Sequence, residues 1–151
     1  MIEAAAKPLV NVAVAVVQRA DGTVLLAERP RGKVSAGYWE FPGGKFDAGE
    51  RPEQALVREL HEEVGIEIER AQPWLIYEHA YPDKRVRLHF YRVFAWRGEP
   101  HGREGQRISW ENPEAPGVAP LLAANDRVLA ALRMPAIYAA TQAAKFGVTE
   151  F

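Results

Sequence analysis

The chain has 151 residues, which is enough for one domain with a hydrophobic core and short for two. Hydrophobic residues make up 48% and charged residues 26%, a globular rather than a disordered composition. The formal net charge of -1 disfavours a nucleic acid polymer as partner, because no overall positive field exists to hold its phosphates. The absence of cysteine excludes disulfides, thiol catalysis and thiolate metal sites.

The N-terminal segment shows no pattern typical of membrane insertion or export. The apolar run over residues 10–17 is too short to span a bilayer. An acidic residue, Glu3, and the lack of a small-residue cleavage pattern are unlike a signal peptide. We therefore expect a soluble cytoplasmic protein without a membrane partner, and the composition leaves monomer and homodimer open.

The first predicted elements are a pair of strands and a long loop. Residues 9–18, "LVNVAVAVVQ", are rich in valine and precede "RADGT", whose Asp-Gly pair is typical of a hairpin turn. We therefore expect residues 23–29 to form the returning strand. Residues 29–44, "RPRGKVSAGYWEFPGG", are dense in glycine and proline and predict a loop.

The rest of the chain predicts two helices separated by two strands. Residues 52–64 predict a helix that ends just before Gly65. Residues 74–82, "WLIYEHAYP", and 85–98, "RVRLHFYRVFAWRG", predict strands, and after a polar loop residues 119–133 predict a second amphipathic helix. Strands occur both as hairpins and around a helix, so we expect an α/β fold in which helices pack on a mixed β-sheet.

The helix over residues 52–64 carries an apolar and an acidic face. The apolar face, which we expect to pack on the core, consists of Leu56, Val57, Leu60 and Val64. The acidic face holds Glu59, Glu62 and Glu63. A solvated acidic face normally includes lysines four residues along, but here only Arg58, four residues before Glu62, offers an opposite charge. Carboxylates gathered without cations indicate a bound divalent cation, either Mg²⁺ or Mn²⁺, and Mg²⁺ usually takes its remaining ligands from phosphates.

The spacing around this helix resembles the Nudix box. Gly44, five residues, Glu50, seven residues and then residues 58–66, "RELHEEVGI", match every defined position of that pattern. The stretch "WEFPGGKFDAGERPEQALVRELHEEVGI", with other segments between residues 9 and 133, resembles the MutT branch of the family. The resemblance implies a Nudix domain over residues 1–133, an α/β/α sandwich with a mixed β-sheet. It also implies metal-dependent hydrolysis of a nucleoside diphosphate linked to another moiety.

The resemblance implies roles for the acidic residues. The implied metal ligands are Glu59, Glu62, Glu63 and Glu104, together with the backbone carbonyl of Gly43 or Gly44. Glu50 and Arg58 are implied as supporting catalytic residues, with Arg58 orienting the carboxylates through charge-assisted hydrogen bonds. We favour Glu59 as the base, because it neighbours Arg58, and Glu104 is the alternative. Without the resemblance, Glu104 is typical of a charge in a loop.

The resemblance also implies a substrate site. Its predicted residues are Arg29, Phe41, Tyr81, Lys84 and Asn125. Arg29 corresponds to a residue that contacts a phosphate, and Asn125 to one that recognises the purine edge; by themselves they are typical of a surface arginine and a helix N-cap. Lys84 stands where the branch carries an arginine, and a lysine lacks the planar fork of donors. Tyr81 is expected to stack on the base or to pack in the core.

The MutT resemblance implies hydrolysis of 8-oxo-dGTP to 8-oxo-dGMP and pyrophosphate, which removes an oxidised nucleotide from the pool. An unmodified dNTP, ADP-ribose or a dinucleotide is the alternative substrate within the family. A non-catalytic nucleotide-recognition module is the alternative of another class. Such modules usually lose the glutamates of the box, and this sequence retains them all.

The last segment, residues 134–151, follows a complete predicted helix and contains a further helical pattern without an obvious partner. "MPAIYAATQAAKFG" faintly resembles the start of the thiamine-phosphate-synthase-like barrel that is fused to some MutT-type proteins. We expect a C-terminal extension, and the start of a further domain is the alternative.

Overall fold

The computed structural model describes residues 6–134. Its elements in chain order are β1 (Leu9–Val17), β2 (Val24–Glu28), β3 (Trp39–Glu40), β4 (Gly43–Lys45), α1 (Pro52–Val64), β5 (Glu67–Ala80), β6 (Arg85–Arg97), β7 (Ile108–Glu111), the 3₁₀ turn η1 (Ala123–Asn125) and α2 (Asp126–Leu132). None of the helices in this part of the chain has the length and apolar character needed to cross a bilayer.

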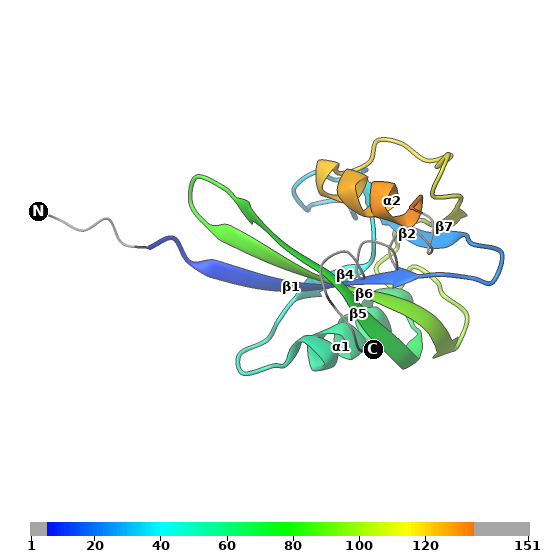
Figure 1. Ribbon diagram of the computed structural model, residues 1–151, viewed down its shortest axis with the longest axis horizontal. Helices are drawn as coiled ribbons and strands as arrows, with labels where there is room; N and C mark the ends of the chain where they lie inside the picture. The colour runs from blue at the N-terminus through cyan, green and yellow to red at the C-terminus, as the bar shows by residue number, and fades with distance from the viewer. Residues whose placement is uncertain (1–5, 135–151) are drawn as a thin grey trace, which may run out of the picture.

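Two β-sheets lie between the helices (Figure 1). The four-stranded sheet has the order β4-β1-β6-β5; β1 and β6 run parallel, and the other neighbours run antiparallel. The three-stranded sheet has the order β3-β2-β7 and is antiparallel. The predicted mixed sheet is confirmed, and a second, smaller sheet accompanies it.

Alternation along β1 creates two hydrophobic cores. Ala13, Ala15 and Val17 belong to the core beneath α1, whereas Val14 and Val16 belong to the core beneath α2. The helices contribute Ala55, Leu56, Leu60 and Val64 to the first core and Val128 and Leu129 to the second. Because α1 and α2 lie on opposite sides of the sheets (Figure 1), the molecule is an α/β/α sandwich, as expected.

The bounds of α1 agree with the prediction, but one residue that was predicted to pack in the core is exposed. Gly65 ends the helix with a φ of 71°, a left-handed conformation that glycine adopts without strain. Val57, however, is 46% exposed, and Ala55 is buried instead. The buried side of the helix includes Glu59 and Glu63, which face a cavity. The inward face of α1 therefore includes these two glutamates, and Val57 lies at the exposed margin of that face.

The loop predicted over residues 29–44 was only partly correct, since it contains β3 and most of β4. Each of these short strands is formed by pairing with a distant segment: Trp39 pairs with Glu28, and Gly44 pairs with Ala13. The polar loop predicted after β6 likewise contains β7, which pairs with β2. Local sequence patterns carry little information on strands that long-range pairing creates.

Two further bounds differ from the prediction. β5 begins at Glu67, before the predicted residues 74–82, and it continues through Pro73 with shifts of register. The helix expected over residues 119–133 begins only with η1 and α2. The preceding segment instead pairs with β3, where Pro120 accepts a hydrogen bond from the Trp39 N–H. Of the predicted extension over residues 134–151, residues 135–151 lie outside the described part of the chain.

Candidate active site

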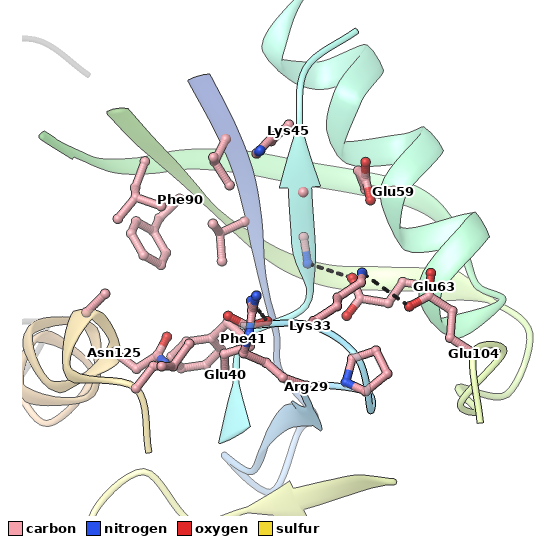
Figure 2. Close-up of a pocket in the computed structure, with 18 residues that line it drawn as sticks. Arg29, Lys33, Glu40, Phe41, Lys45, Glu59, Glu63, Phe90, Glu104 and Asn125 are labelled. Atoms are coloured by element: carbon pink, nitrogen blue, oxygen red, sulfur yellow. Dashed lines mark hydrogen bonds and ion pairs between the residues drawn. The ribbon is translucent and has the colours of Figure 1, made fainter. Parts of the chain in front are cut away.

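A cavity of about 500 Å³ opens between the layers, and Figure 2 shows its lining side chains. One end, the carboxylate end, is formed by Glu59 and Glu63 of α1 and by Glu104 of the loop between β6 and β7. The other end, the apolar end, is formed by Leu88, Phe90, Phe41, Leu122 and Asn125. The two ends lie on opposite sides of the view in Figure 2. The cavity therefore joins a charged compartment to one suited to a flat, largely apolar group.

Glu63 is the carboxylate held deepest in the cavity. Its Oε2 accepts a hydrogen bond of 3.0 Å from the Gly43 N–H. Burial raises the pKa of Glu63 to about 8, and the negative charges of Glu40, Glu104 and Glu59 act in the same direction. An ionised Glu63 is therefore costly in the absence of a nearby positive charge.

Glu59 lies against the backbone of β4. A Cβ placed on Gly44 would come within 2.3 Å of the Glu59 Cδ, so the close approach of this carboxylate to the strand depends on glycine. Its Oε1 also accepts a hydrogen bond of 2.8 Å from the Arg58 Nη1. Strand and helix thus hold Glu59 from two sides.

Arg58 gathers four carboxylates around one guanidinium group. Its Nε lies 2.8 Å from Glu50 and 3.1 Å from Asp47, and its Nη1 lies 2.8 Å from Glu59 and 3.2 Å from Glu62. The hydrogen bonds from Arg58 lower the pKa of Glu50 to about 2. Arg58 therefore ties these carboxylates together, and the supporting catalytic roles of Glu50 and Arg58 stay predictions. Glu62, in contrast, does not line the cavity, and its side chain is 56% exposed.

The loop that carries Glu104 is fastened to the end of α1 by a residue that sequence reasoning missed. Gln106 is only 7% exposed; it accepts a hydrogen bond from the Glu104 N–H at 2.9 Å and donates one to the Glu63 carbonyl at 3.0 Å. The Arg103 N–H donates to the same carbonyl at 3.1 Å. No local pattern marks Gln106, because the Glu63 carbonyl that it contacts is 43 residues away and only the fold brings it near.

Three cationic side chains among the described residues line the cavity, and one of them, Arg29, was predicted from the sequence as a substrate residue. The Arg29 Nη1 lies 2.9 Å from Glu40, and the Lys33 Nζ lies 3.7 Å from Glu104. Lys45 of β4 lines the cavity as well (Figure 2). Nothing in the local sequence distinguishes these two lysines from surface lysines.

Asn125 lies at the apolar end and is only 4% exposed. It occupies the N-cap position of α2, but its side chain makes no capping hydrogen bond. Its Nδ2 instead donates to the Trp39 carbonyl at 3.4 Å. An amide has two N–H donors and a carbonyl acceptor, so it retains both functions for a ligand in the cavity.

Tyr81 and Lys84, the other predicted substrate residues, do not line this cavity. Both belong to the turn between β5 and β6, where the Lys84 Nζ lies 5.7 Å from the centre of the Tyr81 ring. Tyr81 is 42% exposed and lines a neighbouring cavity, which shares Leu122 and Ala124 with the first. The structure therefore brings together Arg29, Phe41 and Asn125 and leaves Tyr81 and Lys84 at a distance.

The donors at the carboxylate end suit a hard divalent cation. All of them are oxygens, and Glu63 gains most from a cation because burial and like charges disfavour its ionised form. Within residues 6–134, no three acidic or imidazole side chains are placed together as a ready-made metal site. In this conformation Arg58 holds Glu59 and Glu62, and Lys33 pairs with Glu104. The chemistry of the donors fits Mg²⁺ or Mn²⁺, and their arrangement has to tighten around it.

Comparison with known proteins identifies the family. The sequence model of the family described as NUDIX domain matches residues 13–131 of this chain. These residues include α1 and every residue that lines the cavity except Val12. The chain belongs to the NUDIX domain family. It is accordingly a Nudix hydrolase, and its Nudix box runs from Gly44 of β4 through α1 to Ile66.

Curated relatives of this Nudix domain are nucleotide hydrolases by name. The 8-oxo-dGTP diphosphatase of Haemophilus influenzae is 44% identical over 109 residues, 72% of this chain and 80% of that protein. Two Escherichia coli proteins are each 37% identical over 123 residues. One is an 8-oxo-dGTP diphosphatase, matched over 82% of this chain and 95% of its own length. The other is a CTP pyrophosphohydrolase, matched over 77% and 90%.

The fold agrees with solved structures of the family. The MutT NUDIX hydrolase from Burkholderia pseudomallei superposes with a TM-score of 0.73 at 31% sequence identity. The superposition covers 82% of this chain and 97% of that one. The α/β sandwich of this Nudix domain is therefore the MutT fold.

Proposed function

We propose that the chain is a Mg²⁺-dependent nucleoside triphosphate pyrophosphohydrolase whose preferred substrate is 8-oxo-dGTP. The observation that carries the proposal is the division of one cavity into a carboxylate end and an apolar end that holds the Asn125 amide. The first end suits a metal-bound triphosphate, and the second suits a purine. The names of the relatives from Haemophilus influenzae and Escherichia coli support this substrate.

The cation belongs to the carboxylate end. Its proposed ligands are Glu59, Glu62, Glu63 and Glu104, with the carbonyl of Gly43 or Gly44 as a further oxygen. When bound, Mg²⁺, or Mn²⁺ in its place, neutralises phosphate charge and makes a coordinated water more acidic. Arg58 orients Glu59 and Glu62, and Glu50 in turn holds Arg58.

The reaction is an attack of water on a phosphorus of the triphosphate. A new P–O bond forms, the bridging P–O bond breaks, and a nucleoside monophosphate and pyrophosphate leave. Glu59 is the proposed base for the proton of the water, because it lies in the cavity and is held by Arg58. Glu104 is the alternative base. Arg29 is proposed to contact the phosphates after leaving Glu40.

Base recognition is proposed for Asn125, with Phe41 as part of the apolar wall. A buried amide that pairs with the altered purine edge leaves unpaired polar groups when another base enters, which costs binding free energy. Tyr81 and Lys84, which do not line this cavity, are proposed to contact the part of the nucleotide nearest the turn between β5 and β6. In the cell, this activity would clear oxidised nucleotides from the cytoplasmic pool before replication.

A second candidate is hydrolysis of a pyrimidine triphosphate, since the Escherichia coli CTP pyrophosphohydrolase matches at the same identity as the 8-oxo-dGTP diphosphatase of that organism. ADP-ribose is the alternative of a different substrate class. Release of the monophosphate from 8-oxo-dGTP, dGTP, CTP and ADP-ribose, measured at substrate concentrations below KM, distinguishes these candidates.

In this panel we expect kcat/KM for 8-oxo-dGTP to exceed that for each of the others by at least about 10-fold. A preference for CTP or ADP-ribose would reject 8-oxo-dGTP as the substrate. Omission of divalent cations should abolish pyrophosphate release. Undiminished release in EDTA would reject the metal-dependent mechanism.

A further inference from the structure

Tyr77, on β5, connects two walls of the apolar end without lining the cavity itself. Its ring stacks on Phe90 with the ring centres 5.7 Å apart and the planes 12° from parallel. Its hydroxyl donates a hydrogen bond to the Ala124 carbonyl. Phe90 and Ala124 both line the cavity, and Ala124 directly precedes Asn125.

The 3₁₀ turn that carries Asn125 is held between the two sheets. On one side, Trp39 of β3 accepts hydrogen bonds from the Leu122 N–H at 3.1 Å and from the Asn125 Nδ2 at 3.4 Å. On the other side, Tyr77 supplies the bond from β5. β3 belongs to the three-stranded sheet and β5 to the four-stranded sheet, so Tyr77 fixes the turn relative to the sheet that forms the opposite cavity wall.

Packing does not replace this hydrogen bond. A second cavity of about 470 Å³ lies beside the turn and is lined by Leu122, Ala123, Ala124 and Tyr77, among others. The turn therefore has open space on this side, where well-packed neighbours would otherwise restrain it. Without the Tyr77 hydroxyl, the turn loses its hydrogen bond to β5 on this open side and retains those to Trp39 on the other, which leaves Ala124 and the adjoining Asn125 less restrained.

We propose that Tyr77 is a positioning residue for base recognition: its bond to the Ala124 carbonyl holds the Asn125 amide where it meets the edge of the base. The inference rests on the proposed role of Asn125. The change Tyr77→Phe removes the hydroxyl and retains the ring on Phe90. A net hydrogen bond contributes roughly 1 kcal/mol, which corresponds to a change of about 5-fold.

The first measurement is the ratio of kcat/KM for 8-oxo-dGTP to that for dGTP. We expect Tyr77→Phe to lower this ratio by about 3- to 10-fold, through KM, with kcat changed less than about 2-fold. The matched control is Tyr91→Phe, which removes from another tyrosine a hydroxyl that donates to Glu53 of α1. An unchanged ratio in Tyr77→Phe, or an equal decrease in Tyr91→Phe, would overturn the inference.

A double-mutant cycle with Asn125→Ala tests whether Tyr77 acts through Asn125. We expect Tyr77→Phe to have no further effect on the ratio once Asn125 is alanine, because the group that it positions is then absent. The affinity for 8-oxo-dGMP, measured by calorimetry, should follow the same pattern. Equal effects of Tyr77→Phe with and without Asn125 would show a general structural role and overturn the inference.

The wild-type protein separates this inference from the proposed substrate. If it prefers another nucleotide of the panel, the proposed substrate is wrong, and the same cycle applied to the KM of that nucleotide decides the inference. Coupling between Tyr77 and Asn125 then supports it, and additivity overturns it. If the wild type neither hydrolyses nor binds any of the nucleotides, both proposals are wrong.

Discussion

Glu62 and Glu63 are neighbours in the sequence with opposite surroundings in the structure. The Glu62 side chain is 56% exposed and contacts Arg58, whereas Glu63 lies in the cavity and accepts a hydrogen bond from Gly43. The sequence predicts both as metal ligands. Glu63 lies among the proposed metal ligands of the cavity, and Glu62 would have to leave Arg58 to join them.

Replacement of either glutamate tests this role. Glu62→Gln and Glu63→Gln should each lower kcat by about 100-fold or more while the fold remains intact, because an amide cannot replace the charge of a carboxylate ligand. Steady-state kinetics with Mg²⁺ titration and circular dichroism measure the two properties. Glu99→Gln, whose parent side chain is 85% exposed, is the control. Near-normal activity in both variants would reject the metal site.

The surroundings of Glu63 also predict a dependence of stability on pH in the metal-free protein. Burial and like charges raise the pKa of Glu63 to about 8, from an ordinary value of 4.5. The folded state thus binds this proton more tightly than the unfolded state. The contribution to stability is complete below the ordinary value and is lost as the pH rises through about 8.

We therefore expect the free energy of unfolding in EDTA to decrease across this pH range in the wild type and to decrease less in Glu63→Gln. At the upper end of the range, the variant should be more stable by on the order of 1–3 kcal/mol. Denaturant titrations at several pH values measure the difference. Parallel curves for the two proteins would contradict the raised pKa.

At the scale of elements, β4 shows how a strand of three residues (Gly43–Lys45) supports a site. A Cβ on Gly43 would lie 2.1 Å from the Ala13 carbonyl oxygen, which belongs to the backbone of β1. A Cβ on Gly44 would meet the end of the Glu59 side chain instead. Gly43 therefore allows β4 to lie close to β1 in the sheet, and Gly44 leaves room for the carboxylate of Glu59.

The two glycines should respond differently to alanine. Gly43→Ala should lower the free energy of unfolding by about 2–3 kcal/mol, because backbone has to move. Gly44→Ala should change stability by about 1 kcal/mol or less but lower kcat by about 10- to 100-fold, because it displaces Glu59. Chemical denaturation and kinetics on both variants provide the test. A larger loss of stability in Gly44→Ala than in Gly43→Ala, or unchanged kcat in Gly44→Ala, would contradict the assignment.

At the scale of the whole molecule, the cavity joins parts of the chain that have no local connection. Its walls come from β1 and β6 of one sheet, the end of β3, the helix α1 and the turn η1. A ligand that contacts both ends therefore connects the α1 side of the sandwich with the side that holds η1 and α2. Its binding free energy adds to the stability of the whole fold.

Product binding should reveal this linkage. At about 100 times its Kd, 8-oxo-dGMP should raise the free energy of unfolding by about 2.7 kcal/mol, and dGMP at the same concentration should raise it less. Asn125→Ala should remove the difference between the two nucleotides. Thermal unfolding followed by calorimetry measures these shifts. Equal stabilisation of the wild type by both nucleotides would contradict recognition of the altered purine by Asn125.

Much of the fold could be predicted from local patterns. The bounds of α1 follow from Pro52, the apolar period and Gly65, and the segments on either side of the Asp-Gly turn are strands, as predicted. The predicted hairpin between these strands is wrong, because β1 and β2 belong to different sheets and are joined by an isolated bridge between Gln18 and Val24. In contrast, β3, β4 and β7 have two to four residues each and owe their existence to distant partners. Long-range pairing of this kind leaves no periodic signal.

The sequence by itself determined the family of this protein and the gathering of its glutamates on one helix, because the spacing of these residues is a local property. Only the tertiary structure decided that Glu63 lies in the cavity while Glu62 faces solvent, and that Gln106 fastens the loop of Glu104. It also decided that Tyr77 supports the turn of Asn125, 48 residues further along the chain. These contacts depend on how the layers pack. Packing brings together residues that are far apart in the chain, and the local sequence around each residue does not predict its partner.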